Sequence, residues 1–357
     1  MEEIARNIDR LATVSLGGRW VSVDKKGTLH VGWTIVPLYE AACKKLDGKP
    51  ISLVAAQRLI EGVKPGDRVL LVASFYSPPS LPYGETDGPL GAASLARAVC
   101  FGLRGIPVLV AGPNELQVLR HSVKVAGMNI YPSISEIKET THGVGAVEVA
   151  FPIVDKEEGK KVAANILDEY APKAVICVET AGPNRKGVKH SGLGAELKGR
   201  LPSLEHLFLE ASARGILSIG IIDGGNEIGS GTIEEDVRRI VPDADVCKCP
   251  CGGGSACAVK TDIVFPASIS NWGAYAITAM VAFLLRKPDI LQDAETERRM
   301  LEACIESGAT DDTTGRTVMG VDRVGHESHE ALVTMLHSII RVTTIRRDES
   351  TLAVLGE

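Results

Sequence analysis

The sequence predicts an α/β fold with a mostly parallel sheet, helices on both of its faces and a Rossmann-like layered architecture. Several short runs rich in valine, isoleucine and leucine are apolar throughout, as strands buried on both faces of a parallel sheet are. Longer segments with helical spacing of apolar residues separate these runs. The chain has 357 residues, of which 45% are hydrophobic and 24% charged, so it can bury a large core.

The strand predictions follow the β-branched runs in order. "RVLLVAS" predicts the first strand, and "PVLVAG", "AVICVE" and "ILSIGIID" are equally clear examples. The predicted strands cover residues 68–74, 107–112, 146–154, 174–179, 216–223 and 262–268. The patterns between them predict helices over residues 92–103, 156–170, 204–214 and 272–285. We expect one unit over residues 1–357, and a division into two lobes would fall near 131–144.

Composition narrows the class of partner. The formal net charge is −6, no long run of lysine and arginine occurs, and aromatic residues make up only 4%. These values argue against a nucleic-acid or membrane surface and favour a small-molecule partner. Early acidic residues and the lack of an apolar N-terminal core disfavour a signal or transit peptide, and eight cysteines suggest reduced thiols. We expect a cytoplasmic protein, and the oligomeric state stays open.

Four unusual loops follow predicted strands. They come after the strand at 68–74, after Glu179, after Ile222 and after the strand at 262–268. In open parallel sheets, ligands bind outside the carboxyl ends of the strands. We therefore expect the four loops to converge on one cleft.

The first of these loops ends in "ETDGPLGAASLARA", where Pro89 suits the first turn of a helix. The free N–H groups at the helix start, residues 88–93, could bind a phosphate or carboxylate. Glu85 and Asp87 could equally cap the helix themselves, and both interpretations stay open. Neither a Gly-Lys-Ser/Thr loop nor a good G-x-G-x-x-G helix start is present, which argues against a nucleotide cofactor.

The stretch "DGGNEIGSG" follows the strand that ends at Asp223. Gly224 and Gly225 allow close approach of the backbone to a ligand, while Asn226 and Glu227 project from the turn. Two carboxylates in different environments can divide acid and base roles. A simple capped turn is the alternative, and we favour a functional site because so many polar and glycine residues are gathered here.

Other candidate residues lie in three further segments. Glu179 ends a buried strand, where an unused carboxylate would be costly to desolvate, and Asn184 lies in the loop that follows. Asn271 stands at the start of a predicted helix, where it could act as an N-cap. Asp311 and Asp322 are the candidate carboxylates nearest the C-terminus.

A cysteine-rich segment, "CKCPCGGGSAC", contains Cys247, Cys249, Cys251 and Cys257. Its spacing is not one of the familiar zinc spacings. It could bind zinc or another soft metal, form a redox pair or line a buried turn. No cofactor is predicted otherwise, although the acidic residues could hold a divalent cation.

Four ordered motifs resemble those of the D-glutamate cyclase family: "GETDGPLGAASLARA", "GIIDGGNEIGSG", "ACAVKTDIVFPASISNWGAYA" and "GATDDTTGRTVMGVD". The resemblance implies cyclisation of D-glutamate to 5-oxo-D-proline with loss of water, a lyase-type reaction. The loop after Glu179 and the cysteine-rich segment depart from the family pattern. The functional positions that the resemblance implies are Asp87, Glu179, Asp223, Asn226, Glu227, Asn271 and Asp311.

For this reaction we expect Glu227 or Asp223 to act as base and Glu179 as acid. The N–H groups of Gly224 and Gly225 would hold the oxyanion.

The helix start, residues 88–93, would bind the substrate α-carboxylate, with Asp87 near the ammonium group and Gly88 close to the ligand. Two other classes of function stay open: a non-catalytic sensor of amino acids or carboxylates, and a metal-dependent hydrolase or lyase.

Overall fold

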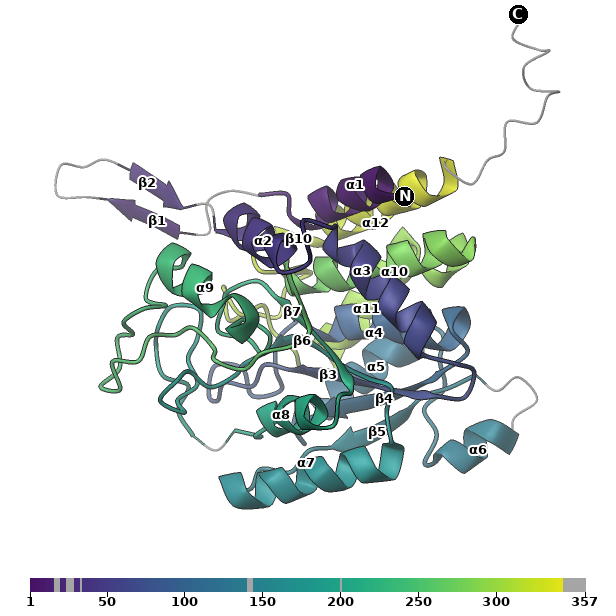
Figure 1. Ribbon diagram of the computed structural model, residues 1–357, viewed down its shortest axis with the longest axis horizontal. Helices are drawn as coiled ribbons and strands as arrows, with labels where there is room; N and C mark the ends of the chain where they lie inside the picture. The colour runs from purple at the N-terminus through teal and green to yellow at the C-terminus, as the bar shows by residue number, and fades with distance from the viewer. Residues whose placement is uncertain (16–19, 24–28, 33, 140–143, 200, 343–357) are drawn as a thin grey trace, which may run out of the picture.

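A six-stranded parallel sheet lies at the centre of the protein (Figure 1). The computed structural model describes residues 1–15, 20–23, 29–32, 34–139, 144–199 and 201–342. The strands of the sheet are β3 (Arg68–Ser74), β4 (Ile106–Ala111), β5 (Val147–Ala150), β6 (Ala174–Thr180), β7 (Leu217–Ile222) and β8 (Ile263–Pro266). Each overlaps a predicted strand, and the predicted parallel sheet is confirmed.

In the described part of the chain, two small antiparallel pairs lie outside this sheet. One pairs β1 (Trp20–Val23) with β2 (Leu29–Gly32). The other pairs β9 (Gly320–Val321) with β10 (Val324–Gly325).

The strand order is β5-β4-β3-β6-β7-β8, with every neighbouring pair parallel. The chain therefore builds the sheet outward from β3 to β5, returns to the other side of β3, and continues outward from β6 to β8. This is the doubly wound order of Rossmann-like folds, and its switch point lies between β3 and β6. Ligands of such sheets bind at the carboxyl ends of the strands beside that point.

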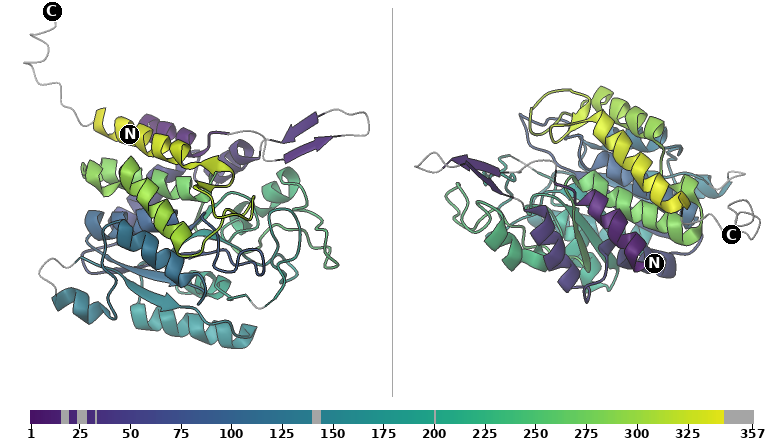
Figure 2. Two further views of the ribbon diagram at one scale, coloured as in Figure 1. Left: turned by 180° about the vertical axis from the view of Figure 1, so that it is seen from behind. Right: turned by 90° about the horizontal axis from the view of Figure 1, so that it is seen from above.

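Helices cover both faces of the sheet (Figures 1 and 2). The helices α3, α4, α5 and α10 contact one face, and α7 and α8 cover the other. A further layer, containing α1, α11 and α12, packs outside the first group. The α-helices are α1 (Glu2–Ala12), α2 (Ile35–Lys44), α3 (Ile51–Gly62), α4 (Pro89–Arg97), α5 (Leu116–Val125), α6 (Ile134–Glu139), α7 (Lys156–Tyr170), α8 (Glu205–Ala213), α9 (Glu234–Ile240), α10 (Ser270–Leu285), α11 (Ala294–Glu306) and α12 (His326–Val342).

The predicted helices at 156–170, 204–214 and 272–285 correspond to α7, α8 and α10. The one predicted at 92–103 begins earlier, as α4, and ends in a π-helical turn over Ala98–Gly102.

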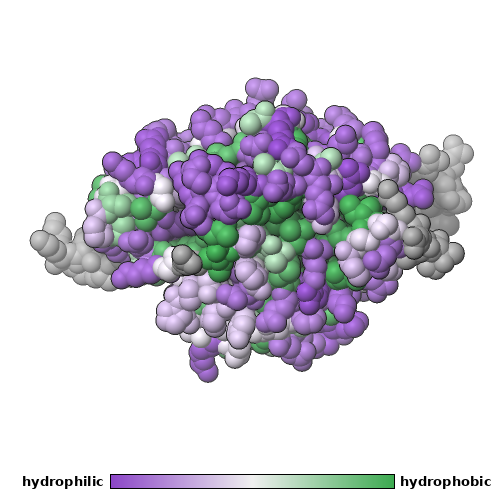
Figure 3. All heavy atoms as spheres, turned by 90° about the horizontal axis from the view of Figure 1, so that it is seen from below, coloured by the Kyte–Doolittle hydropathy of each residue, from purple (hydrophilic) through white to green (hydrophobic). Residues whose placement is uncertain are grey.

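Alternation along the strands divides the core into two parts. Leu71 of β3 belongs to the larger core beneath α4 and α10, whereas its neighbours Leu70 and Val72 belong to the core beneath α7 and α8. Trp272 is buried at the start of α10 and donates its indole N–H to His329 Nδ1 (2.8 Å). Seen from below, the side of α7, the surface is largely hydrophilic with a band of hydrophobic residues across its middle (Figure 3).

Of the helices in the described ranges, none combines the length and the apolar character that a membrane span requires. The stretch near 131–144, where two lobes would divide, includes residues 140–143, which lie outside the described part of the chain.

Candidate functional site

The four loops predicted to converge lie together at the carboxyl ends of β3, β6, β7 and β8. Asn271 donates its backbone N–H to Asp87 Oδ1 (2.8 Å), which joins the start of α10 to the loop after β3. Ser270 donates its hydroxyl to Glu179 Oε2 (2.6 Å) at the end of β6. Carboxylate oxygens of Glu179 and Asp223 lie within 4.8 Å of each other, which adds the end of β7. The site therefore lies at the switch point of the sheet.

The side chain of Asn271 caps the start of α4. Its Oδ1 accepts the backbone N–H groups of Gly88 (2.9 Å) and Gly91 (2.6 Å), and its Nδ2 donates to the carbonyl of Thr86 (3.0 Å). Gly88 has a φ of 101°, and an added Cβ would lie 3.0 Å from the carbonyl oxygen of Val178. We expected this helix start to bind a substrate carboxylate, but the side chain of Asn271 already accepts two of its N–H groups.

Glu179 occupies a bulge in β6. Ala73 of β3 pairs with Val178 and Ser74 pairs with Thr180, so Glu179 is an extra residue in the ladder. Its φ of 46° lies in the left-handed region, which is uncommon for a residue with a side chain. Bulges redirect side chains and occur often beside functional sites.

Glu227 closes the glycine-rich turn after β7. Its Oε1 accepts the N–H of Gly224 (2.9 Å) and its Oε2 accepts the N–H of Gly225 (2.7 Å). These are the two N–H groups that we expected to hold an oxyanion, and in this structure they stabilise negative charge on Glu227 instead. Gly225 has a φ of 92°, and an added Cβ would lie 2.5 Å from Val237 Cγ1. Close packing against α9 therefore requires this glycine.

Burial and mutual repulsion raise the pKa values of several carboxyl groups and so favour their neutral forms. Desolvation, followed by the charges of Asp223 and Glu227, raises the pKa of Glu179 well above its ordinary value. Desolvation followed by Asp223 raises the pKa of Asp87 to about 8. The pKa of Glu85 is also well above its ordinary value, chiefly through burial. Acids whose neutral form is favoured therefore lie beside Glu227, whose carboxylate oxygens accept two N–H bonds.

Among the residues that the structure describes, two groups of acids could hold a cation, because their oxygens come within 4.8 Å of one another. The first is Asp87, Asp223 and Asp322, and the second is Glu179, Asp223 and Glu227. Asp223 belongs to both. All are buried except Asp322, which is half-buried, so the cluster reaches the surface on the side of the loop before β10.

Other predicted residues lie apart from this cluster or serve the loops. Asp311 accepts the N–H groups of Thr314 (2.7 Å) and Arg323 (2.9 Å), which shapes the loop containing Asp322. Asn226 donates its side-chain N–H to the carbonyl of His190 (3.1 Å), which ties the glycine-rich turn to the loop after β6.

The cysteines separate into two environments. Cys247, Cys249 and Cys251 come together, and His190 joins them. Cys257 does not belong to that group and is fully buried elsewhere. Asn184 lies beside the group, where its Nδ2 donates to the carbonyl of Gly254 (2.7 Å).

Sequence reasoning treated Glu85 only as a possible helix cap, did not single out Ser270 as a site residue, and missed the place of both residues in the site. The signal for Glu85 was its position in the same loop, two residues before Asp87. No comparable signal existed for Ser270, whose contact with Glu179 depends on the bulge in β6.

Comparison with known proteins gives a consistent assignment. The family described as "D-glutamate cyclase-like, C-terminal" matches residues 40–337. The human protein named "D-glutamate cyclase, mitochondrial" is 27% identical over 293 residues, which cover 74% of this chain and 43% of the human protein. The chain thus spans less than half the length of that relative. With the family match extending over most of the sequence and all four predicted loops gathered at one site, this chain belongs to the D-glutamate cyclase-like, C-terminal family.

Proposed function

We propose that the protein cyclises D-glutamate to 5-oxo-D-proline with loss of water, by general acid–base catalysis at the carboxylate cluster. The observation that carries the proposal is the pairing of Glu179 with Glu227. Oxygens of the two side chains come within 4.8 Å, yet burial and repulsion favour the neutral form of Glu179 while two N–H donors stabilise charge on Glu227. An acid and a base side by side are what this reaction needs.

In the proposed reaction, the ammonium proton of glutamate passes to its γ-carboxylate, and the neutral α-amine then attacks the γ-carboxyl carbon. A C–N bond forms as Glu227 accepts a proton from nitrogen. The C–O bond to the departing hydroxyl breaks as Glu179 donates its proton, which releases water. Each such proton transfer contributes roughly 10²–10⁴-fold to the rate. Ring closure is intramolecular, so the site has only to hold one folded conformer of the substrate.

The choice of substrate rests on the family and on the name of the human relative. Asp87 is a candidate partner for the substrate ammonium group. A substrate with two carboxylates would meet repulsion at this acidic site unless positive charge were supplied. The two groups of acids sharing Asp223 favour a divalent cation as the source, because hard cations such as Mg²⁺ and Mn²⁺ prefer carboxylate oxygens. Polarisation of a substrate carboxyl group is the chemistry that such an ion supplies.

The test is NMR of D- and L-glutamate incubated separately with the full chain, with and without added Mg²⁺ or Mn²⁺. We expect 5-oxoproline from the D enantiomer alone. Glu227→Gln should lower turnover by about 10²–10⁴-fold. Glu158→Gln is the control, because Glu158 lies on the exposed face of α7. Absence of product under every condition would refute the proposal, and glutamate binding without product would point to a sensor.

A further inference from the structure

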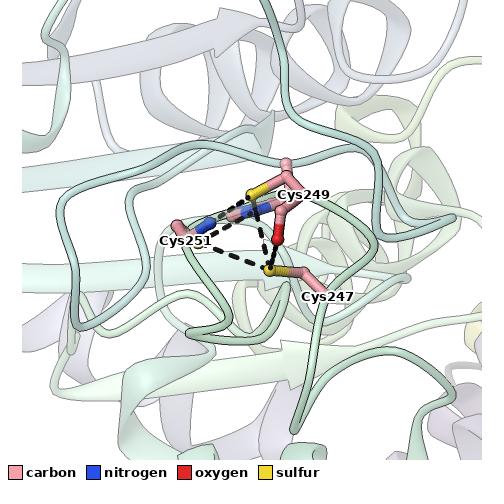
Figure 4. A group of neighbouring side chains, drawn as sticks. Cys247, Cys249 and Cys251 are labelled. Carbon is pink, nitrogen blue, oxygen red and sulfur yellow. Dashed lines mark hydrogen bonds between the residues drawn. The ribbon is translucent and has the colours of Figure 1, made fainter.

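Three cysteines and one histidine form a compact group outside the carboxylate cluster (Figure 4 shows the cysteines). Cys247 Sγ lies 3.5 Å from Cys249 Sγ and 3.3 Å from Cys251 Sγ. His190 Nε2 lies 3.2 Å from Cys249 Sγ and 3.7 Å from Cys251 Sγ. His190 comes from the loop after β6, whereas the cysteines come from the segment between α9 and β8. Two segments distant in sequence thus bring together three sulfur atoms and one imidazole nitrogen.

From this geometry we propose that His190, Cys247, Cys249 and Cys251 bind one zinc ion. Zinc–sulfur bonds of about 2.3 Å and zinc–nitrogen bonds of about 2.0–2.1 Å in a tetrahedron separate sulfurs by roughly 3.8 Å and sulfur from nitrogen by roughly 3.6 Å. The four distances between 3.2 and 3.7 Å are close to those edges. Four protein ligands complete the coordination, so the site is structural and leaves no position for a substrate.

The surroundings of the group are those of a prepared metal site. His190 is fully buried, and its Nδ1 lies 3.2 Å from the carbonyl of Val188, which directs Nε2 toward the sulfurs. The backbone N–H of Gly253 donates to Cys251 Sγ and that of Cys251 donates to Cys249 Sγ, each at 3.4 Å. Such N–H donors stabilise thiolate charge.

The zinc would also support the candidate active site. The carbonyl of His190 accepts the side-chain N–H of Asn226 from the glycine-rich turn. A zinc ion that holds the imidazole of His190 would therefore also hold the carbonyl to which Asn226 of that turn is bonded. This inference stands apart from the proposed reaction, because a closed zinc site requires no particular substrate.

The first experiment measures the metal content of the full chain purified without chelators. We expect one zinc ion per chain. Replacement of zinc by Co²⁺ in chelator-treated protein should give thiolate-to-cobalt charge-transfer absorption and the visible bands of a tetrahedral ion. Adding zinc to the chelator-treated protein should raise its melting temperature, since the ion binds the folded state. These measurements use the unsubstituted chain and do not depend on a variant folding.

Variants identify the ligands. Cys249→Ser and His190→Ala should each lose zinc on dialysis, while Cys257→Ser is the matched control from the same cysteine-rich segment and should keep it. Lack of zinc together with lack of the cobalt spectrum would overturn the proposal. Equal loss of zinc in Cys257→Ser would overturn the ligand assignment. A disulfide between two of the three cysteines in metal-free, freshly purified protein would replace the metal site with a redox pair.

Discussion

The substitution Asn271→Ala tests the connection between α10 and the start of α4. Asn271 is fully buried, and its side chain makes three hydrogen bonds to the backbone of the loop and helix that carry Asp87. The N–H of Gly88 also donates to Asp87 Oδ1, so it keeps a partner after the substitution. The N–H of Gly91 and the carbonyl of Thr86 lose the bonds that the side chain of Asn271 makes.

An unsatisfied buried polar group costs about 1–3 kcal/mol. Two such groups predict a loss of roughly 2–6 kcal/mol in the free energy of unfolding. If the denaturant slope is about 3 kcal/mol per molar urea, the unfolding midpoint should fall by roughly 0.7–2 M. The assay is urea unfolding followed by circular dichroism.

Ser268→Ala is the control, because this residue lies just upstream and its hydroxyl makes a single exposed hydrogen bond, to the carbonyl of Val14 (2.6 Å). We expect it to change the free energy of unfolding by no more than about 0.5 kcal/mol. If Asn271→Ala and Ser268→Ala proved equally mild, the capping role assigned to Asn271 would be wrong.

Two further predictions concern stability. Burial, followed by nearby charge, raises the pKa of Asp87 from 3.8 to about 8, and burial raises that of Glu297 from 4.5 to about 7. The folded state therefore keeps protons that the unfolded chain has lost, so this stabilisation is complete below the ordinary pKa values and disappears as pH rises through the raised ones. We expect the free energy of unfolding in urea titrations to fall from about pH 5 to about pH 8, and a flat or rising profile would contradict these pKa shifts. The second prediction concerns the contact between α4 and α10. Gly91→Ala places a Cβ 2.9 Å from that of Ala274 and should lower the free energy of unfolding by about 1–3 kcal/mol. Gly62→Ala is the control, because its Cβ would have no atom within 4 Å, and it should raise the free energy of unfolding by up to about 1 kcal/mol. Equal effects of the two substitutions would show that α4 and α10 tolerate separation.

The central sheet was predictable because its signal is local. Continuous apolar runs such as the one in β6 are typical of strands in a sheet covered on both faces. The helices of the outer layer were harder to predict. For α1 and α12, amphipathic patterns lie far from the predicted strands of the central sheet, and the contacts between these two helices are distant in sequence.

The candidate site was predictable to the level of its loops. Position at the end of a strand or in the loop after it places Asp87, Glu179 and Asp223 at one edge of a parallel sheet, whatever the details of the turns. Individual hydrogen bonds could not be inferred, because they depend on side chains that cross between loops. Glu227 bonding to the N–H groups of its own turn is an example.

The cysteine group shows the limit of spacing rules. A C-x-C-x-C segment provides three sulfurs, and no rule of spacing reveals that the fourth donor comes from His190, 57 residues before Cys247 in the chain. The loop after β6 brings His190 to the three cysteines. Cys257 shares the segment but is directed into the core beneath α7 and α8.

The bulge at Glu179 makes the site sensitive to the length of β6. Because side chains alternate along a strand, deleting one residue ahead of Glu179 would turn every following side chain to the opposite face of the sheet. Ser74 would then pair not with Thr180 but with a residue that in the present structure lies beyond the site. A point substitution in β6 changes the contacts of one side chain. A single-residue insertion or deletion there would instead turn the side chain of Glu179 away from the carboxylate cluster and into the core. Homologous chains that keep this chemistry should therefore keep the number of residues in β6 ahead of this acid, even where the residues themselves differ.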